Sequence, residues 1–152
     1  MSDLINPSLV RLDVDLGSDK DAVIRGLAAI LGDAGRTGDV ERVATDVLAR
    51  EGKSPTGLPG GIALPHARTA GVEQPTVAFA RLVPPVVFGE AHGPADLAIL
   101  ITAPMTGDAT HLQMLTKLAR ALVKPAFIHA LRAARTPDDA VDEILAVLEP
   151  AR

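Results

Sequence analysis

The most informative segment of this 152-residue chain reads Asp96-Leu97-Ala98-Ile99-Leu100-Ile101-Thr102. Five consecutive apolar residues stand between its polar ends, so both faces of a strand formed here would be buried. Such a strand belongs in the middle of a covered sheet. The run from Thr76 to Val83 predicts a second strand. Pro84 and Pro85 are expected to end it, leaving at most a short edge piece over residues 86–88.

Alternation and helical periodicity extend this pattern to both ends of the chain. Leu9 to Leu16 alternates apolar and charged residues, which predicts a half-buried strand. Ser18 is a suitable N-cap for the helix that follows. Amphipathic spacing predicts helices over Asp19–Ala34, Asp39–Glu51, Asp108 or Thr110 to Val123, Pro125–Ala134 and Thr136–Leu148. In the third of these helices, the expected apolar side consists of Leu112, Leu115, Leu118, Ala119 and Leu122.

The segment from Gly52 to Pro65 differs from the rest of the chain. It holds seven Gly and Pro residues, which predicts a long irregular loop, and loops of this length in compact domains are usually functional or mobile. Strands interleaved with helices indicate an α/β fold, a mixed β-sheet flanked by helices on its faces. A purely parallel sheet is not expected, because the middle strands are joined by loops too short for crossover helices. Without a linker or repeat, residues 1–152 are expected to form a single domain.

Composition argues against several classes of function. A net charge of −4 and an aromatic content of 2% do not suit nucleic-acid binding, which uses a basic face and stacking rings. The chain has no Cys, which excludes disulfides, thiolate catalysis and iron–sulfur clusters. No apolar run approaches the ~20 residues of a membrane span. The first residues also lack the regions of a signal peptide, so the expected location is the cytoplasm.

His66 is the strongest candidate for chemistry among the four His residues. It ends the stretch Gly60-Gly61-Ile62-Ala63-Leu64-Pro65-His66, in which a glycine-rich loop leads into a short apolar strand. Pro65 restricts its own φ and the conformation of Leu64, so the backbone that presents the imidazole is stiff. A neutral imidazole is a usable nucleophile near pH 7. A His that is hydrogen-bonded within a tight turn is the alternative explanation.

A second His and two Arg residues could support such a nucleophile. His111 stands at the start of a predicted helix after the central strand, where backbone N–H groups and the helix dipole favour an anion. Arg50 and Arg68 could bind a phosphate through their planar guanidinium groups, although Arg68 is equally well explained as a surface charge. His92 and His129 are interpreted as structural.

Other chemistries find less support. Two His residues without a matched carboxylate or a third His are weak evidence for zinc, so no metal is expected. A serine hydrolase is also disfavoured, because no Gly-x-Ser-x-Gly occurs and no Ser follows Ser54. The glycine-rich phosphate loops of ATP- and NAD-binding proteins do not occur either, so no cofactor is expected.

Several spaced segments together form a family pattern. They are Arg50-Glu51 with Ser54-Pro55-Thr56-Gly57, Gly61-Ile62-Ala63-Leu64-Pro65-His66, Pro75–Leu82, and Pro94–Pro104 with His111-Leu112. From about Leu4 to Leu148 the chain resembles the fructose/mannitol-type EIIA domain of the bacterial phosphoenolpyruvate-dependent sugar phosphotransferase system. The segment that ends at His66 resembles the active-site stretch of that family.

The resemblance implies a phosphocarrier. His66 would accept a phosphoryl group from the carrier phospho-HPr, hold it on Nε2 and pass it to a cysteine of an EIIB domain for sugar uptake. His111 and Arg50 would help to bind the phosphoryl group, without a metal or cofactor. EIIB and the membrane component EIIC would be separate polypeptides, and fructose and mannitol remain equally open as the sugar.

Two alternatives stay open at this point. A regulatory, nitrogen-related EIIA shares the phosphorylated His but acts through phosphorylation-dependent partner binding. A binding module that has lost phosphotransfer is the other alternative, and the presence of both His66 and His111 argues against it.

Overall fold

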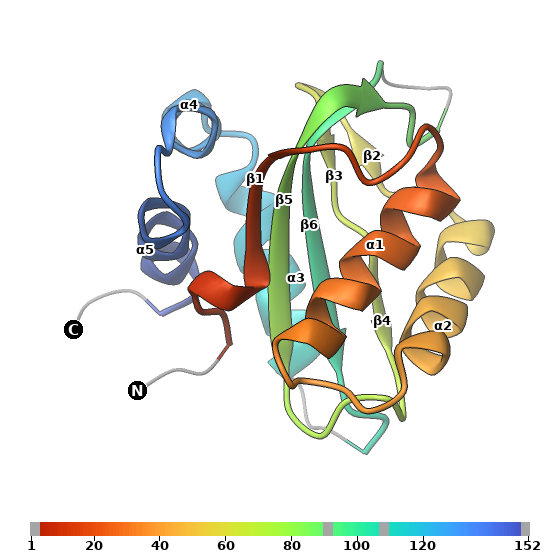
Figure 1. The fold of residues 1–152 in the computed structure, drawn as a ribbon. Helices are drawn as coiled ribbons and strands as arrows, with labels where there is room; N and C mark the ends of the chain where they lie inside the picture. Colours follow the sequence, from red (N-terminus) through yellow and green to blue (C-terminus); the bar gives the residue numbers. More distant parts are fainter. Residues whose placement is uncertain (1–3, 90–92, 107–109, 150–152) are drawn as a thin grey trace.

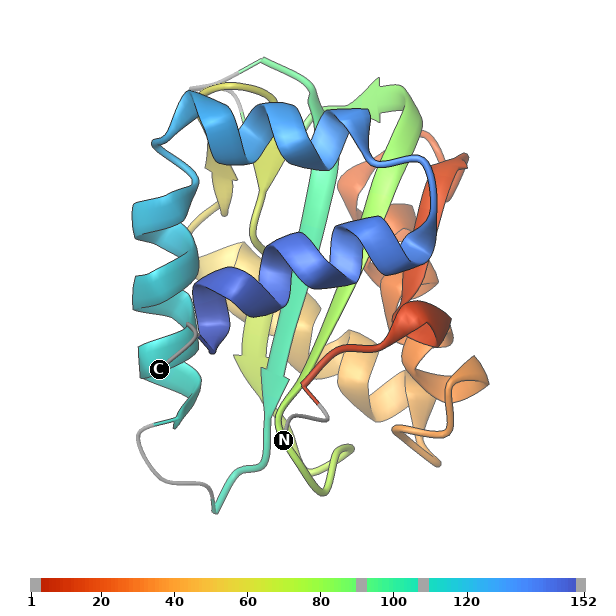
Figure 2. The same ribbon diagram turned by 90° about the vertical axis from the view of Figure 1, so that its left-hand side faces the viewer.

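The structure, a computed structural model, describes residues 4–89, 93–106 and 110–149. A mixed β-sheet lies between two layers of helices (Figure 1). One face is covered by α1 (Lys20–Asp33) and α2 (Val40–Lys53). The other is covered by α3 (Thr110–Ala121), α4 (Pro125–Ala133) and α5 (Pro137–Leu148), with α4 and α5 running across it (Figure 2). The α/β class predicted from the sequence, a mixed sheet flanked by helices, is confirmed.

Six strands form the sheet in the part of the chain that the structure describes, in the order β1-β5-β6-β3-β2 with β4 beside β6. Their bounds are β1 Val10–Val14, β2 Gly57–Leu58, β3 Ile62–Ala63, β4 His66–Arg68, β5 Thr76–Val86 and β6 Ala95–Ala103, and a short 3₁₀ helix, η1 (Pro7–Leu9), precedes β1. β5 and β6 are antiparallel, whereas β1 runs parallel to β5, and β3 and β4 run parallel to β6. The sheet is therefore mixed, as the short connections predict.

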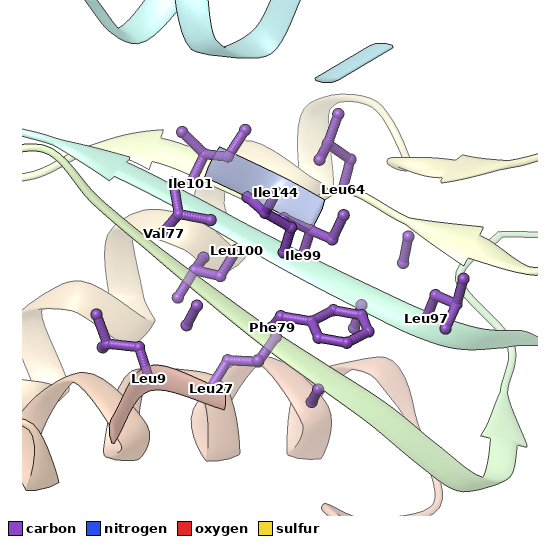
Figure 3. Packing of buried hydrophobic residues seen from close by; sticks show 14 of the residues in the cluster. Leu9, Leu27, Leu64, Val77, Phe79, Leu97, Ile99, Leu100, Ile101 and Ile144 are labelled. Atoms are coloured by element: carbon purple, nitrogen blue, oxygen red, sulfur yellow. The ribbon is translucent and has the colours of Figure 1, made fainter. Parts of the chain in front are cut away.

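β6 forms the centre of the hydrophobic core. Residues 97–101 are all buried, because helices cover both faces of this strand. Figure 3 shows Ile144 of α5 beside Ile99 and Ile101, while Leu27 of α1 lies on the opposite side of the sheet. A strand that is apolar at successive positions can be buried on both faces at once. The sequence of this segment therefore predicts a central position in the sheet.

β5 is longer than the sequence predicts. It continues through Pro84 and Pro85 to Val86, which pairs with Ala95 after an irregularity in the register. Both prolines are exposed. β1 ends opposite Leu82, so on that side the prolines lie beyond the last paired position. A missing N–H there interrupts no ladder of hydrogen bonds, and the strand tolerates both prolines.

The helix boundaries agree with the sequence to within a few residues. Thr136 caps α5 as predicted, with its side chain accepting a hydrogen bond from the Asp139 N–H. Asp19, rather than Ser18, caps α1, because the Asp19 carboxylate accepts from the Ala22 N–H. Among the described residues, no helix combines the length and apolar character that crossing a membrane requires.

The apolar side of α3 differs from the prediction. Leu112 is 63% exposed, and Ala119 is also exposed. The buried side instead contains His111, Met114 and Leu118, which follow each other at helical spacing. This places the His in the interior and the neighbouring Leu on the surface. The predicted cap Asp108 lies outside the described residues.

Candidate active site

A small hairpin precedes His66, where the sequence predicts an irregular loop. β2 and β3 pair as antiparallel strands of two residues each. Gly60 and Gly61 lie in the turn between them with φ of 92° and 83°, a left-handed region that favours glycine. The Gly and Pro residues of this segment are therefore compatible with a hairpin, because they fall in the turn and at the ends of very short strands.

His66 is the first residue of β4, which pairs only with β6 among the described strands. It lies opposite Ile101, whose N–H donates to the carbonyl of Pro65 at 3.0 Å. The imidazole is half-buried. The central strand thus fixes the backbone on one side of His66, while its position on an edge strand leaves the ring accessible.

The Nδ1 atom of His66 lies 2.8 Å from the carbonyl oxygen of Leu64. A carbonyl oxygen only accepts, so the contact assigns the proton of the neutral ring to Nδ1 and the lone pair to Nε2. Burial lowers the pKa of His66 below 6.5, and the charge of Arg50 lowers it further, while the Leu64 hydrogen bond and Glu51 oppose the shift. Near pH 7 the ring is therefore neutral, with a nucleophilic Nε2.

The structure brings His111 beside His66. The two ring centroids are 5.8 Å apart and the ring planes are inclined by 45°. His111 is only 8% exposed, and burial, aided by the charges of His66, Arg68 and Arg50, lowers its pKa to about 4. His111 is therefore a neutral imidazole near pH 7.

The Nδ1 atom of His111 is buried and has no hydrogen-bond partner among the described residues. An unpaired buried N–H is rarer in proteins than an unpaired acceptor. We therefore assign the lone pair to Nδ1 and the proton to Nε2. In this tautomer, His111 can donate one hydrogen bond to an anion through its Nε2–H.

Arg50 and Arg68 surround the two rings with positive charge. Arg50 lies in the last turn of α2, and Arg68 follows His66 by two residues on β4, which puts both side chains on the same side of the strand. The charges of both Arg residues lower the pKa of His111. Arg50 has no hydrogen-bond or ion-pair partner among the described residues, so its guanidinium group is available to an anion.

Arg132 was not identified from the sequence. Its Nε and Nη2 atoms donate to the two carboxylate oxygens of Asp96 at 2.9 and 2.7 Å. Nη2 also donates to the carbonyl of Gly60. Arg132 therefore connects α4, the start of β6 and the turn before His66. No sequence signal links residues so far apart in the chain.

Of the two remaining His residues, only one lies in the part of the chain that the structure describes. His129 is exposed on α4 and makes no hydrogen bond with any described residue, which gives no support to a structural role. His92 lies outside the described residues. Within residues 4–89, 93–106 and 110–149, no three His, Asp or Glu side chains gather into a group that could hold a metal ion. The site is thus a pair of neutral imidazoles beside two guanidinium groups.

Comparison with known families agrees with this fold. Residues 3–147 match the family described as phosphoenolpyruvate-dependent sugar phosphotransferase system, EIIA 2. The chain belongs to this family, which makes it an EIIA phosphotransferase component and confirms the resemblance seen in the sequence.

Two curated relatives are informative. A fructose-specific EIIA component of Haloferax volcanii is 36% identical over 131 residues, which cover 86% of this chain and 85% of the relative. A fructose-specific EIIABC component of Bacillus subtilis is 32% identical over 95% of this chain, but the match covers only 23% of that longer protein.

Solved structures show the same fold. The nitrogen regulatory protein IIA-Ntr of Neisseria meningitidis has a TM-score of 0.84 and 27% identity, covering 93% of this chain and 96% of its own. The mannitol enzyme IIA of Escherichia coli, solved in complex with phosphorylated mannitol enzyme IIB, has a TM-score of 0.72 and 28% identity. That match covers 97% of this chain and 98% of the other.

Proposed function

We propose that this chain carries a phosphoryl group on Nε2 of His66, as the EIIA phosphocarrier of a fructose- or mannitol-class sugar phosphotransferase system. The observation that supports this most directly is the 2.8 Å contact between His66 Nδ1 and the Leu64 carbonyl, which leaves the lone pair on Nε2. Membership in the EIIA family supports the same conclusion. A cytoplasmic location, where phosphoenolpyruvate is produced, belongs to this proposal.

The phosphoryl donor in this proposal is phospho-HPr. The Nε2 lone pair of His66 attacks phosphorus, the bond from phosphorus to the donor imidazole breaks, and its electron pair returns to the donor nitrogen. The His66 ring gains positive charge as the new bond forms. The Leu64 carbonyl, as acceptor for Nδ1–H, stabilises that charge without removing the proton.

The acceptor is a cysteine thiolate of an EIIB domain. The thiolate attacks phosphorus, the P–N bond breaks and its electron pair returns to Nε2 of His66. A ring that keeps its Nδ1 proton is a better leaving group than a deprotonated ring, so the Leu64 contact assists both transfers. The complex that the related E. coli mannitol enzyme IIA forms with enzyme IIB supports this partner.

His111 and Arg50 are proposed to bind the phosphoryl oxygens. Phosphoryl transfer passes through a loose transition state with charge on its equatorial oxygens, so placed donors and cations supply most of the catalysis. A neutral His111 donates one hydrogen bond, and Arg50 adds a charged fork. Neither group needs a metal or a cofactor to contact the phosphoryl oxygens.

A regulatory role is the second candidate. The Neisseria nitrogen regulatory protein matches with a TM-score of 0.84, against 0.76 and 0.72 for two structures of the E. coli mannitol enzyme IIA. The phosphorylation chemistry at His66 would be the same in both roles. The difference lies in whether the phosphoryl group is transferred to EIIB or changes the affinity for another protein.

Labelled phosphoenolpyruvate with enzyme I and HPr tests the first step. The wild-type chain is expected to become labelled, and His66→Ala is expected to stay unlabelled. His129→Gln, at an exposed His on α4, is the matched control and should be labelled like wild type. Persistent label on His66→Ala would refute the assignment. Transfer from the labelled chain to EIIB proteins then distinguishes transport from regulation.

A further inference from the structure

A buried carboxylate, Glu51, has so far entered only as a charge that raises the pKa of His66. Its side chain is 2% exposed and lies in the last turn of α2. Burial disfavours a carboxylate, and the negative end of a helix dipole disfavours it again. Among the described residues, Lys20 alone forms an ion pair with Glu51, at 3.9 Å. A carboxylate in this unfavourable position needs strong hydrogen bonds, and both of its oxygens have one.

Thr56 supplies both hydrogen bonds. Its backbone N–H donates to Glu51 Oε2 at 2.9 Å, and its hydroxyl donates to Oε1 at 2.6 Å. Bonds of this kind to an ionised acceptor are about twice as strong as neutral ones. Glu51 therefore fixes both the backbone and the side chain of Thr56, which immediately precedes β2.

Thr56 is in turn bonded to the residue that orients His66. The Leu64 N–H donates to the Thr56 carbonyl at 3.1 Å, and this contact extends the β2–β3 hairpin by one pair. The Leu64 carbonyl then accepts from His66 Nδ1 at 2.8 Å. A continuous series of hydrogen bonds thus connects Glu51 to the imidazole through Thr56 and Leu64.

From this series we infer that Glu51 is a positioning residue for His66. By holding Thr56, it fixes the β2 end of the hairpin and with it the direction of the Leu64 carbonyl. That carbonyl holds the Nδ1–H tautomer and the ring orientation in which Nε2 is the nucleophile. The inference deepens the proposed function and rests on it wherever phosphorylation of His66 is concerned.

Three variants separate the possible roles of Glu51. Glu51→Ala removes both bonds to Thr56. Glu51→Gln can keep both, because its amide oxygen accepts from the N–H and its amide nitrogen donates to the hydroxyl, while the charge is lost. Thr56→Val removes only the hydroxyl link. Val43→Ala, a buried truncation two turns earlier on α2, is the control for general loss of stability.

The first measurement is the ¹⁵N chemical shift of each His66 ring nitrogen in the unphosphorylated protein. Wild type, Glu51→Gln and Val43→Ala are expected to show Nδ1–H. Glu51→Ala should shift clearly towards Nε2–H, and Thr56→Val should shift partially, which keeps the test decisive if the alanine variant does not fold. Wild-type shifts in every one of these two variants that folds, Glu51→Ala or Thr56→Val, would overturn the inference.

The second measurement is phosphoryl transfer from phospho-HPr. Glu51→Ala should lower kcat about tenfold with KM nearly unchanged, since a misdirected nucleophile slows the step while the buried residue touches no partner. Glu51→Gln should restore most of the rate, and a rate as low as that of Glu51→Ala would contradict positioning through hydrogen bonds. If wild type accepts no phosphate on His66, the proposed function is wrong, but the tautomer comparison still decides the role of Glu51.

Discussion

The imidazole rings of His66 and His111 lie 5.8 Å apart between centroids and are inclined by 45°, so they do not stack. His66 is the first residue of β4, and His111 lies in the first turn of α3. Both rings are neutral near pH 7. A phosphoryl group held on one ring can therefore receive a hydrogen bond from the other.

His111 is expected to accelerate phosphoryl transfer without being indispensable. His111→Ala should slow labelling of His66 about a hundredfold, at the lower end of the roughly hundred- to thousandfold loss found when one donor to a transition-state oxygen is removed. His111→Gln should recover part of the rate, because its amide N–H lies near the position of Nε2. Rapid-quench labelling from phospho-HPr measures both, and equal rates for the two variants would count against a hydrogen-bond donor at this position.

Arg50 is expected to contribute a charge-assisted hydrogen bond to the phosphoryl group. Arg50→Ala should weaken phosphoryl stabilisation by about 1–3 kcal/mol, since bonds to charged groups are in that range. Arg42→Ala is the matched control, because this exposed Arg lies on the same helix and pairs with Asp46. Quench-flow rates of the two variants are compared. Similar losses in both would assign the effect to α2 and not to the site.

The low pKa of His111 predicts a pH dependence of stability. Its folded-state pKa is about 4, against 6.5 for the unfolded chain, so the unfolded state binds more protons between these values. Stability should be fully present above pH 6.5 and fall as the pH decreases towards 4, with up to about 3 kcal/mol lost from this residue. Urea unfolding at pH 7 and pH 5 should show a smaller change for His111→Gln. An equal change in both proteins would contradict the prediction.

Gly61 is expected to be required for the hairpin that precedes His66. Its φ is 83°, and a Cβ built on it would lie 2.7 Å from Arg132 Nη2 and 2.8 Å from Asp96 Oδ1. Gly61→Ala should therefore destabilise the protein by about 1–3 kcal/mol. Gly38→Ala is the control, because no atom lies within 4 Å of its Cβ position. Denaturant unfolding compares the two, and an equally small effect would argue against strain at position 61.

The ion pair between Arg132 and Asp96 is expected to stabilise the same turn. Arg132→Met should cost about 1 kcal/mol, since the pair is bidentate but partly exposed. Arg135→Met, at a nearby exposed Arg whose side chain forms no ion pair with any described residue, should have little effect. A double-mutant cycle with Asp96→Asn measures the coupling in unfolding experiments. Additive losses would show that the two side chains act independently.

Much of the fold could be predicted because its signals are local. The apolar run in β6 requires burial on both faces, and Thr136-Pro137 marks the start of a helix from neighbouring residues alone. The predictions were wrong where residues far apart in the sequence determine the local structure. β5 tolerates Pro84 and Pro85 because β1 ends before them. Leu112 is exposed because its helix turns His111 towards the interior instead.

The sequence alone identified His66, His111 and Arg50 as candidates, since residue type and position in the chain suffice to propose a nucleophile and two side chains that could support it. Only the tertiary structure decided which nitrogen of His66 keeps its lone pair, because that depends on the carbonyl of Leu64. It also revealed the roles of Glu51 and Arg132. Both side chains form hydrogen bonds with backbone groups of another segment. Residue type does not predict such bonds, because almost every residue carries the same backbone donor and acceptor.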